Sequence, residues 1–234
     1  MKIKNTPKHV AIILDGNRRF AKRLLNHPFK GHEWGAKKIE ALVDWAHESG
    51  IRELTLWAFS LENFGRPKDE FEYLMRVFKE NFERLKDDKR IFENRIRIRV
   101  IGRIGMFPDD IEKAMRDIME LTKHHDKFII NFAMAYGGRG EIIDAVNSLA
   151  KDIKDSKLKP GQITNKIFEN YLYMKDAPDL IIRTGGAKRT SGFLLWQSDY
   201  SEYIFLDKFW PDFEEEDFIK CLEEYSLRQR RFGK

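Results

Sequence analysis

His9–Leu14 reads HVAIIL, an almost continuous apolar run, and the polar segment Asp15–Arg19, DGNRR, follows it at once. A short, unbroken apolar run of this kind is typical of a strand that is covered on both faces. Comparable runs recur along the chain. They predict further strands at Glu53–Phe59, Ile96–Ile101, Phe128–Ala135 and Leu180–Ile182, with a last short strand at Tyr203–Leu206.

Amphipathic stretches with helical spacing lie between these runs. They predict helices at His32–Ser49, Asp69–Leu85, Pro108–Thr122, Glu141–Lys151 and Phe213–Leu227. Alternation of strands and helices predicts an α/β fold with a mostly parallel central sheet flanked by helices. The one linker-like stretch, Lys154–Gln162, is too short to divide domains, so we expect residues 1–234 to form a single domain.

Composition narrows the class of protein without fixing its partner. The chain has 234 residues, of which 42% are hydrophobic and 35% charged, so it is globular, and its net charge of +5 suits anionic partners such as phosphates, nucleic acid or an acidic membrane surface. Its single cysteine, Cys221, excludes an intramolecular disulfide and a cysteine-based metal site. With no signal-peptide or membrane-spanning run predicted, we expect a cytoplasmic protein.

Polar segments follow the predicted strands at the points where a parallel sheet binds its ligands, beyond the carboxyl ends of the strands. We therefore expect them to converge on one rim. The segments are Asp15–Arg19, Ser60–Arg66, Tyr136–Gly140 and Arg183–Ser191.

Two of these segments have the composition of a phosphate site. In Asp15–Arg19, glycine allows close backbone approach, two arginines offer forks for diphosphate oxygens, and the aspartate can hold Mg²⁺. A plain turn is the competing interpretation. Arg183–Ser191 combines Gly-Gly with three cations and three hydroxyls, and matches neither a Walker A loop nor a dinucleotide fingerprint. Here the competing interpretation is a basic surface loop.

Other candidates carry equally open alternatives. Asn63 either orients a substrate or caps a loop, and His32 either donates to an anion or is structural. Glu202 is a second candidate metal carboxylate or a solvated acid. A helical stripe is either ordinary core or one wall of an apolar tunnel for a long hydrocarbon. Its members are Phe71, Leu74, Met75, Phe78, Phe82 and Leu85.

Taken together, in order and at their spacing, the motifs resemble the cis-prenyltransferases of the undecaprenyl diphosphate synthase family. The resemblance runs from about His9 to Gly233. Arg18 stands where many bacterial members have glycine, which is similar to archaeal members. The motifs are HVAIILDGNRRFA, GHEWGAKK, LTLWAFSLENFGRP, NFAMAYGGRGEI, DLIIRTGGAKRTSGFLLWQSDYSEYIF and WPDF.

The resemblance implies Mg²⁺-dependent enzymes that condense isopentenyl diphosphate repeatedly onto an allylic diphosphate, here farnesyl or geranylgeranyl diphosphate. The product is a long Z-polyprenyl diphosphate, the precursor of a glycosyl carrier lipid. It also implies a central sheet with an apolar tunnel, a homodimer, and peripheral contact with a membrane when product leaves. Nucleic acid is not an expected partner.

Carried over motif by motif, the resemblance makes Asp15 the essential acid beside the allylic diphosphate and a Mg²⁺ ligand. Glu202 is the second metal ligand, within the chain or across the dimer, and Asn63 is the second catalytic residue. The remaining residues bind the substrates. The residues implied to bind the allylic diphosphate are Gly16, Asn17, Arg18, Arg19, Phe20 and His32. Those implied to line the reacting centre are Ser60, Leu61, Glu62, Phe64 and Arg66. Those implied to bind isopentenyl diphosphate are Arg183, Arg189, Thr190 and Ser191.

The C-terminal tail, residues 228–234, matches the family's R-x-G at Arg231 and Gly233, which implies that it reaches the partner's site. Two positions depart from the family pattern: Pro28 stands where some members have arginine, and Phe64 replaces a frequent tryptophan.

Two other functions are compatible with parts of the sequence. A non-catalytic subunit of a heteromeric prenyltransferase typically loses the first motif, whereas Asp15, Arg19 and Asn63 are present here. A basic RNA-binding protein is the alternative from another class, and the sequence carries no RNA motif that favours it. The DDxxD motif of trans-prenyltransferases is absent. Chain length, the starter and the identity of the base (the diphosphate itself, Asn63 or a water) are left open.

Overall fold

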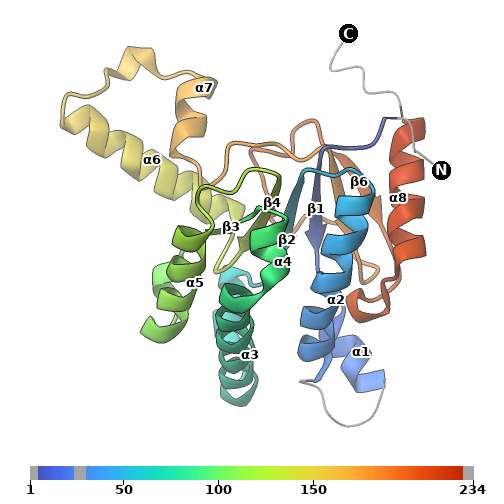
Figure 1. Cartoon of the computed structure of the whole chain (residues 1–234). Coiled ribbons are helices and arrows are strands. Elements are labelled where there is room, and N and C mark those ends of the chain that lie inside the picture. Colours follow the sequence, from blue (N-terminus) through green and yellow to red (C-terminus); the bar gives the residue numbers. More distant parts are fainter. Residues whose placement is uncertain (1–4, 24–29, 229–234) are drawn as a thin grey trace.

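The centre of the molecule is a six-stranded sheet in the order β3-β4-β2-β1-β5-β6, with every strand parallel to its neighbours. This is seen in a computed structural model that describes residues 5–23 and 30–228 (Figure 1). All six predicted strands are confirmed within two residues at each end. Their bounds are β1 His9–Ile13, β2 Glu53–Trp57, β3 Ile96–Ile101, β4 Phe128–Ala133, β5 Leu180–Arg183 and β6 Glu202–Phe205.

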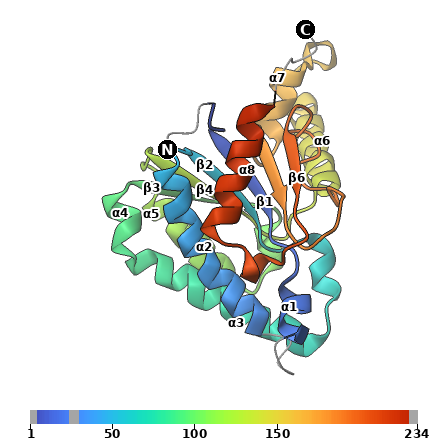
Figure 2. The ribbon, with the colours of Figure 1, turned by 90° about the vertical axis from the view of Figure 1, so that its right-hand side faces the viewer.

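Both faces of the sheet are covered, as the unbroken apolar strands predict. In β1, Val10 and Ile12 belong to one core and Ala11 and Ile13 to the other. Figure 2 shows α2 and α8 crossing in front of the strands on the first face. The helices with buried residues in that core are α2 Lys30–Glu48, α3 Lys68–Asp87, α4 Lys89–Glu93, α5 Asp109–Leu121 and α8 Glu215–Leu227.

Several short elements were not predicted. The segment that the sequence presents as a loop after β1 turns into α1, Asn17–Arg23, after only three residues. Helix α4, helix α7 (Asn165–Phe168) and the 3₁₀ turn Leu61–Gly65 are also short, with four or five residues each. Hydrophobic periodicity needs a window of 11–18 residues, so it does not detect elements of this length. Helix α6, Gly138–Lys154, is longer than predicted because it begins at the glycines of the rim segment.

Strand β1 lies at the point where the order in which strands are added to the sheet reverses, with β2 on one side and β5 on the other. Ligands of open α/β sheets bind in the crevice at such a point, beyond the carboxyl ends of the strands. Ile13 at the end of β1 pairs with Arg183 at the end of β5. The fold therefore brings the segments after β1 and β5 together. Among the helices of the described residues, none has the length and apolarity needed to cross a bilayer.

A buried polar cluster lies at the amino ends of the strands. His9 Nε2 is 2.7 Å from the Thr55 hydroxyl, and the Asn131 amide donates to Thr55 at 2.9 Å and to Glu53 at 2.7 Å. His9 is 4% exposed. Burial lowers the pKa of His9 from 6.5 to about 4. The ring is therefore neutral in the folded protein at any pH above about 4.

This pKa predicts a pH dependence of stability. Between about pH 6.5 and pH 4 the unfolded chain protonates His9 while the folded protein does not, so the free energy of unfolding falls as the pH falls. A His9→Gln variant lacks this term, which amounts to at most about 1.4 kcal/mol per pH unit. Urea unfolding of both proteins from roughly pH 7 to pH 5 measures it. Carboxylates common to both proteins cancel in the comparison, and equal slopes would contradict the prediction.

Candidate active site

Three of the four rim segments line one cavity of about 330 Å³, which we call the Arg183 cavity. It contains Asp15 and Asn17 from the first segment, Ser60, Asn63 and Arg66 from the second, and Arg183, Arg189 and Ser191 from the last. The fourth segment lies at the same rim, as expected, because Tyr136 forms a bridge with Ser60, but it does not line this cavity.

The fourth segment, Tyr136–Gly140, supports the rim from behind. The fully buried Tyr136 donates its hydroxyl to Glu141 at 2.5 Å, and its carbonyl accepts the amide of Leu61 at 3.1 Å. The segment therefore fixes the base of the Ser60–Arg66 loop rather than its ligand-facing side.

Asp15 is held between two arginines from different parts of the chain. Its Oδ1 accepts from Arg19 Nη2 at 3.1 Å, and its Oδ2 accepts from Arg183 Nη2 at 3.0 Å. The Thr184 hydroxyl fixes the backbone, because it accepts the Asp15 amide at 3.1 Å and donates to the Asp15 carbonyl at 2.8 Å. The carboxylate side chain remains 30% exposed, so a ligand can still reach it.

Two glycines make this arrangement sterically possible. Gly16 has φ +110°, and a Cβ placed on it would lie 2.8 Å from the Phe209 ring. Gly185 has φ +88°, and its Cβ would lie 2.7 Å from Arg19 Nη2. The positive φ would strain a side chain at either position, and at Gly16 the side chain would also collide with the Phe209 backbone, which explains both glycines.

Arg183 organises the loop that follows β5. It is 5% exposed, and its Nη1 donates to the Arg189 carbonyl at 2.5 Å and to the Ser191 hydroxyl at 2.8 Å. Its buried Nε has no partner among the described residues. A buried guanidinium with an unpaired N–H beside a cavity favours an anionic ligand there.

Glu70, which the sequence analysis missed, interacts with three side chains of the site. It is 2% exposed, bonds to Arg66 and to His32 Nε2 at 3.3 Å, and lies 3.5 Å from Arg18 Nε. Burial alone would raise the pKa of this carboxyl, but Arg66 and the other two neighbours hold it below its usual value. The only sequence signal for this role is the i, i+4 spacing of Arg66 and Glu70.

His32 is a structural partner in this arrangement. Burial, and then the charge of Arg66, lower the pKa of His32, so the ring is neutral at pH 7. Since an ionised carboxylate only accepts, the single ring N–H is directed to Glu70 and not to an anion in the cavity.

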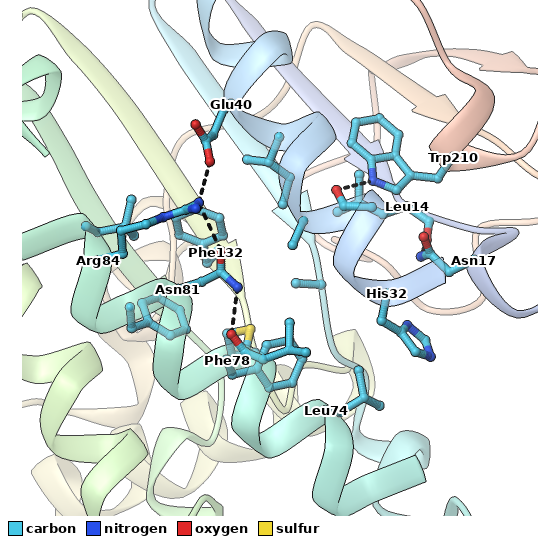
Figure 3. Close-up of a pocket in the computed structure, with 18 residues that line it drawn as sticks. Leu14, Asn17, His32, Glu40, Leu74, Phe78, Asn81, Arg84, Phe132 and Trp210 are labelled. Atoms are coloured by element: carbon cyan, nitrogen blue, oxygen red, sulfur yellow. Dashed lines mark hydrogen bonds and ion pairs between the residues drawn. The ribbon is translucent and has the colours of Figure 1, made fainter. Parts of the chain in front are cut away.

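Three cavities meet at this rim. A second polar cavity of about 380 Å³, the Arg19 cavity, shares Asp15 and Arg66 with the Arg183 cavity. An apolar cavity of about 120 Å³ opens between α2 and α3, and shares Leu14, Asn17 and His32 with both (Figure 3). The Arg19 cavity is lined by Leu14, Asp15, Gly16, Asn17, Arg18, Arg19, Lys22, His32 and Arg66.

Only part of the helical stripe that was predicted to form a tunnel wall lines a cavity. Leu74, Phe78, Phe82 and Leu85 line the apolar cavity. Met75 and Phe71 do not line it and pack in the core instead. Both interpretations of the stripe therefore apply, each to some of its members.

Asn63 is both a cap and a cavity residue. Its Oδ1 accepts the amide of Ser60 at 3.0 Å, so its NH₂ group is the part left for the Arg183 cavity. This geometry leaves the NH₂ group as a hydrogen-bond donor for the cavity at this position.

Five predicted binding residues do not line the cavities described above. Leu61 packs on Gly137 and Gly140, and Glu62 is exposed. Phe64 lies in an aromatic cluster with ring centroids 5.1 Å from Phe59 and 5.5 Å from Phe107. The other two are Phe20, whose ring packs edge-on against Trp34 at a centroid distance of 5.3 Å, and the partly exposed Thr190. The binding roles of all five residues stay predictions.

Glu202 does not meet Asp15 within one chain. It begins the edge strand β6 at the amino ends of the strands, whereas Asp15 follows the carboxyl end of β1, and its carboxylate accepts from Arg228 at 2.7 Å. Pro28, Arg231 and Gly233 lie outside the described residues.

Of the described residues that line the Arg19 and Arg183 cavities, Asp15 is the only carboxylate. Among the described residues, no group of three or more His, Cys, Asp or Glu side chains could hold a metal ion. One carboxylate fits Mg²⁺, which commonly takes one or two carboxylates and completes its shell with substrate phosphates and water.

Comparison with known proteins agrees with this geometry. The model of a family described as putative undecaprenyl diphosphate synthase matches residues 13–233. A Pyrococcus abyssi protein named tritrans,polycis-undecaprenyl-diphosphate synthase (geranylgeranyl-diphosphate specific) is 45% identical over 97% of this chain and 87% of its own length. A Methanocaldococcus jannaschii protein of the same name is 46% identical over 98% of this chain and 84% of its own.

Two solved structures share the fold. Lavandulyl diphosphate synthase from Lavandula x intermedia, in complex with dimethylallyl diphosphate, has a TM-score of 0.93 and 35% identity over 98% of this chain and 99% of its own. A probable undecaprenyl diphosphate synthase from Campylobacter jejuni has a TM-score of 0.81 and 32% identity over 98% of this chain and 100% of its own.

The cation-lined cavities predict that the protein binds inorganic pyrophosphate. Arg19→Gln removes one fork of the Arg19 cavity and should weaken binding by about 10- to 100-fold, since a hydrogen bond to a charged group contributes roughly 1.5–3 kcal/mol. Titration calorimetry measures the affinity. Arg116→Gln, an exposed arginine of α5, is the matched control and should bind like the wild type. Equal affinity of both variants would contradict the assignment.

Proposed function

The chain belongs to the undecaprenyl diphosphate synthase family of cis-prenyltransferases, and we propose that it condenses isopentenyl diphosphate repeatedly onto an allylic diphosphate to build a long Z-polyprenyl diphosphate. One observation carries the proposal. The Arg19 and Arg183 cavities meet at Asp15, and an apolar cavity opens from the same place. Such a site can hold two diphosphates and one hydrocarbon with the reacting carbons between them.

The starter we propose is geranylgeranyl diphosphate. The relatives from Pyrococcus abyssi and Methanocaldococcus jannaschii carry this specificity in their names. Its diphosphate would lie in the Arg19 cavity with the hydrocarbon between α2 and α3. Isopentenyl diphosphate, which has only five carbons, would lie in the Arg183 cavity near Arg189 and Ser191.

The chemistry follows from where charge develops. When the allylic C–O bond breaks, negative charge grows on the departing diphosphate, and Arg19 and Arg66 are fixed beside it by Asp15 and Glu70. Mg²⁺ bound at Asp15 would neutralise part of that charge. The new carbon–carbon bond forms to isopentenyl diphosphate, whose C2 then loses a proton.

Asn63 is poorly suited to accept that proton. Its oxygen already accepts the Ser60 amide, so it offers an NH₂ donor that can hold a phosphate oxygen. The departing diphosphate or a water is the better base. Glu202 can add a ligand to Mg²⁺ only from a second copy of the chain, because it lies at the amino end of β6 whereas Asp15 follows the carboxyl end of β1.

Asp15→Asn should lower incorporation of radiolabelled isopentenyl diphosphate by at least about 100-fold in kcat/KM. The substitution removes the charge that orients Arg19 and Arg183 and the one carboxylate offered to Mg²⁺. Wild-type protein with geranylgeranyl diphosphate should incorporate label, and EDTA should stop it. Equal circular dichroism would show that the variant is folded, and a fully active variant would remove Asp15 from this role.

We further propose a homodimer that uses one end of α6. Ile143 and Val146 on this helix are 56% and 46% exposed, and Leu195 is 39% exposed. The loop that carries Leu195 packs on the helix start, where the Gly138 amide donates to the Gly192 carbonyl at 2.8 Å. Exposed apolar side chains on one helix and on the loop packed at its start favour burial against another protein surface.

Val146→Glu should convert the dimer into a monomer, because it places a charge in the centre of this surface. Light scattering after size exclusion measures the mass. Leu121→Glu, which adds the same charge at an exposed leucine of α5, is the control and should stay dimeric. A wild type that is monomeric, or a dimeric Val146→Glu, would exclude this interface.

The alternatives fit the site less well. A non-catalytic subunit does not need Asp15, Arg19 and Arg183 assembled around a cavity, as they are here. An RNA-binding protein needs cations spread over an open surface, whereas the arginines of this site converge on the rim of the sheet. We place the enzyme in the cytoplasm, at a membrane surface when the product leaves.

A further inference from the structure

Phe209 packs against the Arg19 side of the site, although the sequence analysis did not single it out. It immediately precedes the WPDF motif, in the turn before α8, and Figures 1 and 2 show this turn lying beside α1. The Arg19 guanidinium carbon is 5.1 Å from the centroid of the Phe209 ring, and that of Arg23, one turn later in α1, is 5.7 Å from it. Two cations of one helix therefore contact the same aromatic ring.

The backbone that carries this ring is hydrogen-bonded to both phosphate-binding segments. The Trp210 amide donates to the Asp15 carbonyl at 3.0 Å, and the Gly185 amide donates to the carbonyl of the residue before Phe209 at 2.7 Å. Gly16 packs against Phe209 itself, since a Cβ on Gly16 would lie 2.9 Å from the Phe209 Cα. The ring therefore has a fixed position relative to Asp15, from which it can hold a neighbouring side chain.

Arg23 joins α1 to the turn that carries the ring. Its Nη2 donates to both carboxylate oxygens of Asp212, at 2.7 and 3.0 Å, and its guanidinium carbon also lies 5.3 Å from the centroid of the Phe20 ring. Arg23 does not line the Arg19 cavity, whereas Arg19 does. The two arginines therefore have different tasks, because Arg23 anchors the helix and Arg19 faces the ligand site.

Asp15 alone is a weak restraint on Arg19. Their hydrogen bond is 3.1 Å long, the two side chains are 50% and 30% exposed, and exposed pairs of this kind contribute little. An anionic ligand would also compete with Asp15 for the N–H groups of Arg19. A phenyl ring is not a conventional hydrogen-bond acceptor, so its attraction for the cation leaves those N–H groups available to phosphate oxygens.

We propose that Phe209 is a positioning residue, which holds the Arg19 guanidinium at the Arg19 cavity through a cation–π contact and so prepares it to bind the diphosphate of the allylic substrate. This inference rests on the proposed function for the identity of that substrate. Phe209 does not line the Arg19 cavity, so it acts through Arg19.

The first test measures binding of inorganic pyrophosphate by titration calorimetry. Phe209→Leu keeps an apolar side chain and removes the ring, so it should weaken binding by about 3- to 10-fold, the effect of a cation–π contact. Phe209→Tyr keeps the ring and should bind like the wild type. Phe92→Leu, which makes the same change at a partly exposed phenylalanine of α4, is the matched control and should also bind like the wild type.

A double-mutant cycle shows whether the ring acts through Arg19. In an Arg19→Gln background, Phe209→Leu should cause no further loss of pyrophosphate affinity, because the cation that the ring positions is absent. In steady-state kinetics, Phe209→Leu should raise the KM for geranylgeranyl diphosphate by a similar factor. It should leave the KM for isopentenyl diphosphate unchanged, because that substrate would lie at Arg183. A general disturbance of the fold would affect both substrates.

Phe209→Met, which also lacks a ring, replaces Phe209→Leu if circular dichroism shows that the latter is not folded. Wild-type affinity in the folded variants, an equal loss in Phe209→Tyr or in the control, or an undiminished effect in the Arg19→Gln background would overturn the inference while leaving the proposed function intact. A wild type that binds pyrophosphate but makes no Z-polyprenyl product would instead refute the proposed function, and the coupling between Phe209 and Arg19 would still be measured by binding.

Discussion

The ion pair between Asp15 and Arg183 is the contact on which the rest of the site depends. It joins the ends of β1 and β5, two neighbouring strands that are 168 residues apart in the chain. A parallel sheet brings strand ends together but leaves the following segments free to diverge. Here the pair closes them onto each other, with Gly16 and Gly185 in positive-φ conformations that favour glycine and with no space for a side chain at Gly16. The cavities on either side of Asp15 are consequences of this closure.

Cationic side chains that lie close together repel one another, so carboxylates are needed to hold them in position before an anionic ligand binds. Asp15 holds Arg19 and Arg183, and Glu70 holds Arg66 with Arg18 and His32 close by. The two acids differ in exposure, since Asp15 can be reached by a ligand and Glu70 is buried. Asp15 is thus placed to take part in binding, whereas Glu70 positions the groups that bind. Such preorganised charge is what stabilises a departing diphosphate effectively.

The positions of the strands and their burial on both faces could be predicted, because a strand that is covered on both faces has a continuous apolar sequence. The convergence of the segments after β1, β2 and β5 followed from the parallel sheet. Contacts between distant segments could not be predicted: Glu70 is an ordinary helix-start acid until the fold brings Arg18 and His32 to it. Glu202 is the converse case, since the family motif groups it with Asp15 while its position at the start of β6 places it at the amino ends of the strands, away from Asp15. Asn63 shows why alternatives remain open in a sequence, because it is a cap and a cavity residue together.

The most direct measurement is a crystal structure of the protein with isopentenyl diphosphate and an unreactive thio analogue of geranylgeranyl diphosphate. Our account predicts one diphosphate at Arg19 and the other at Arg183, on either side of Asp15, with the hydrocarbon lying between α2 and α3 toward Asn81. Both diphosphates in one cavity, or a hydrocarbon outside the space between these helices, would contradict it.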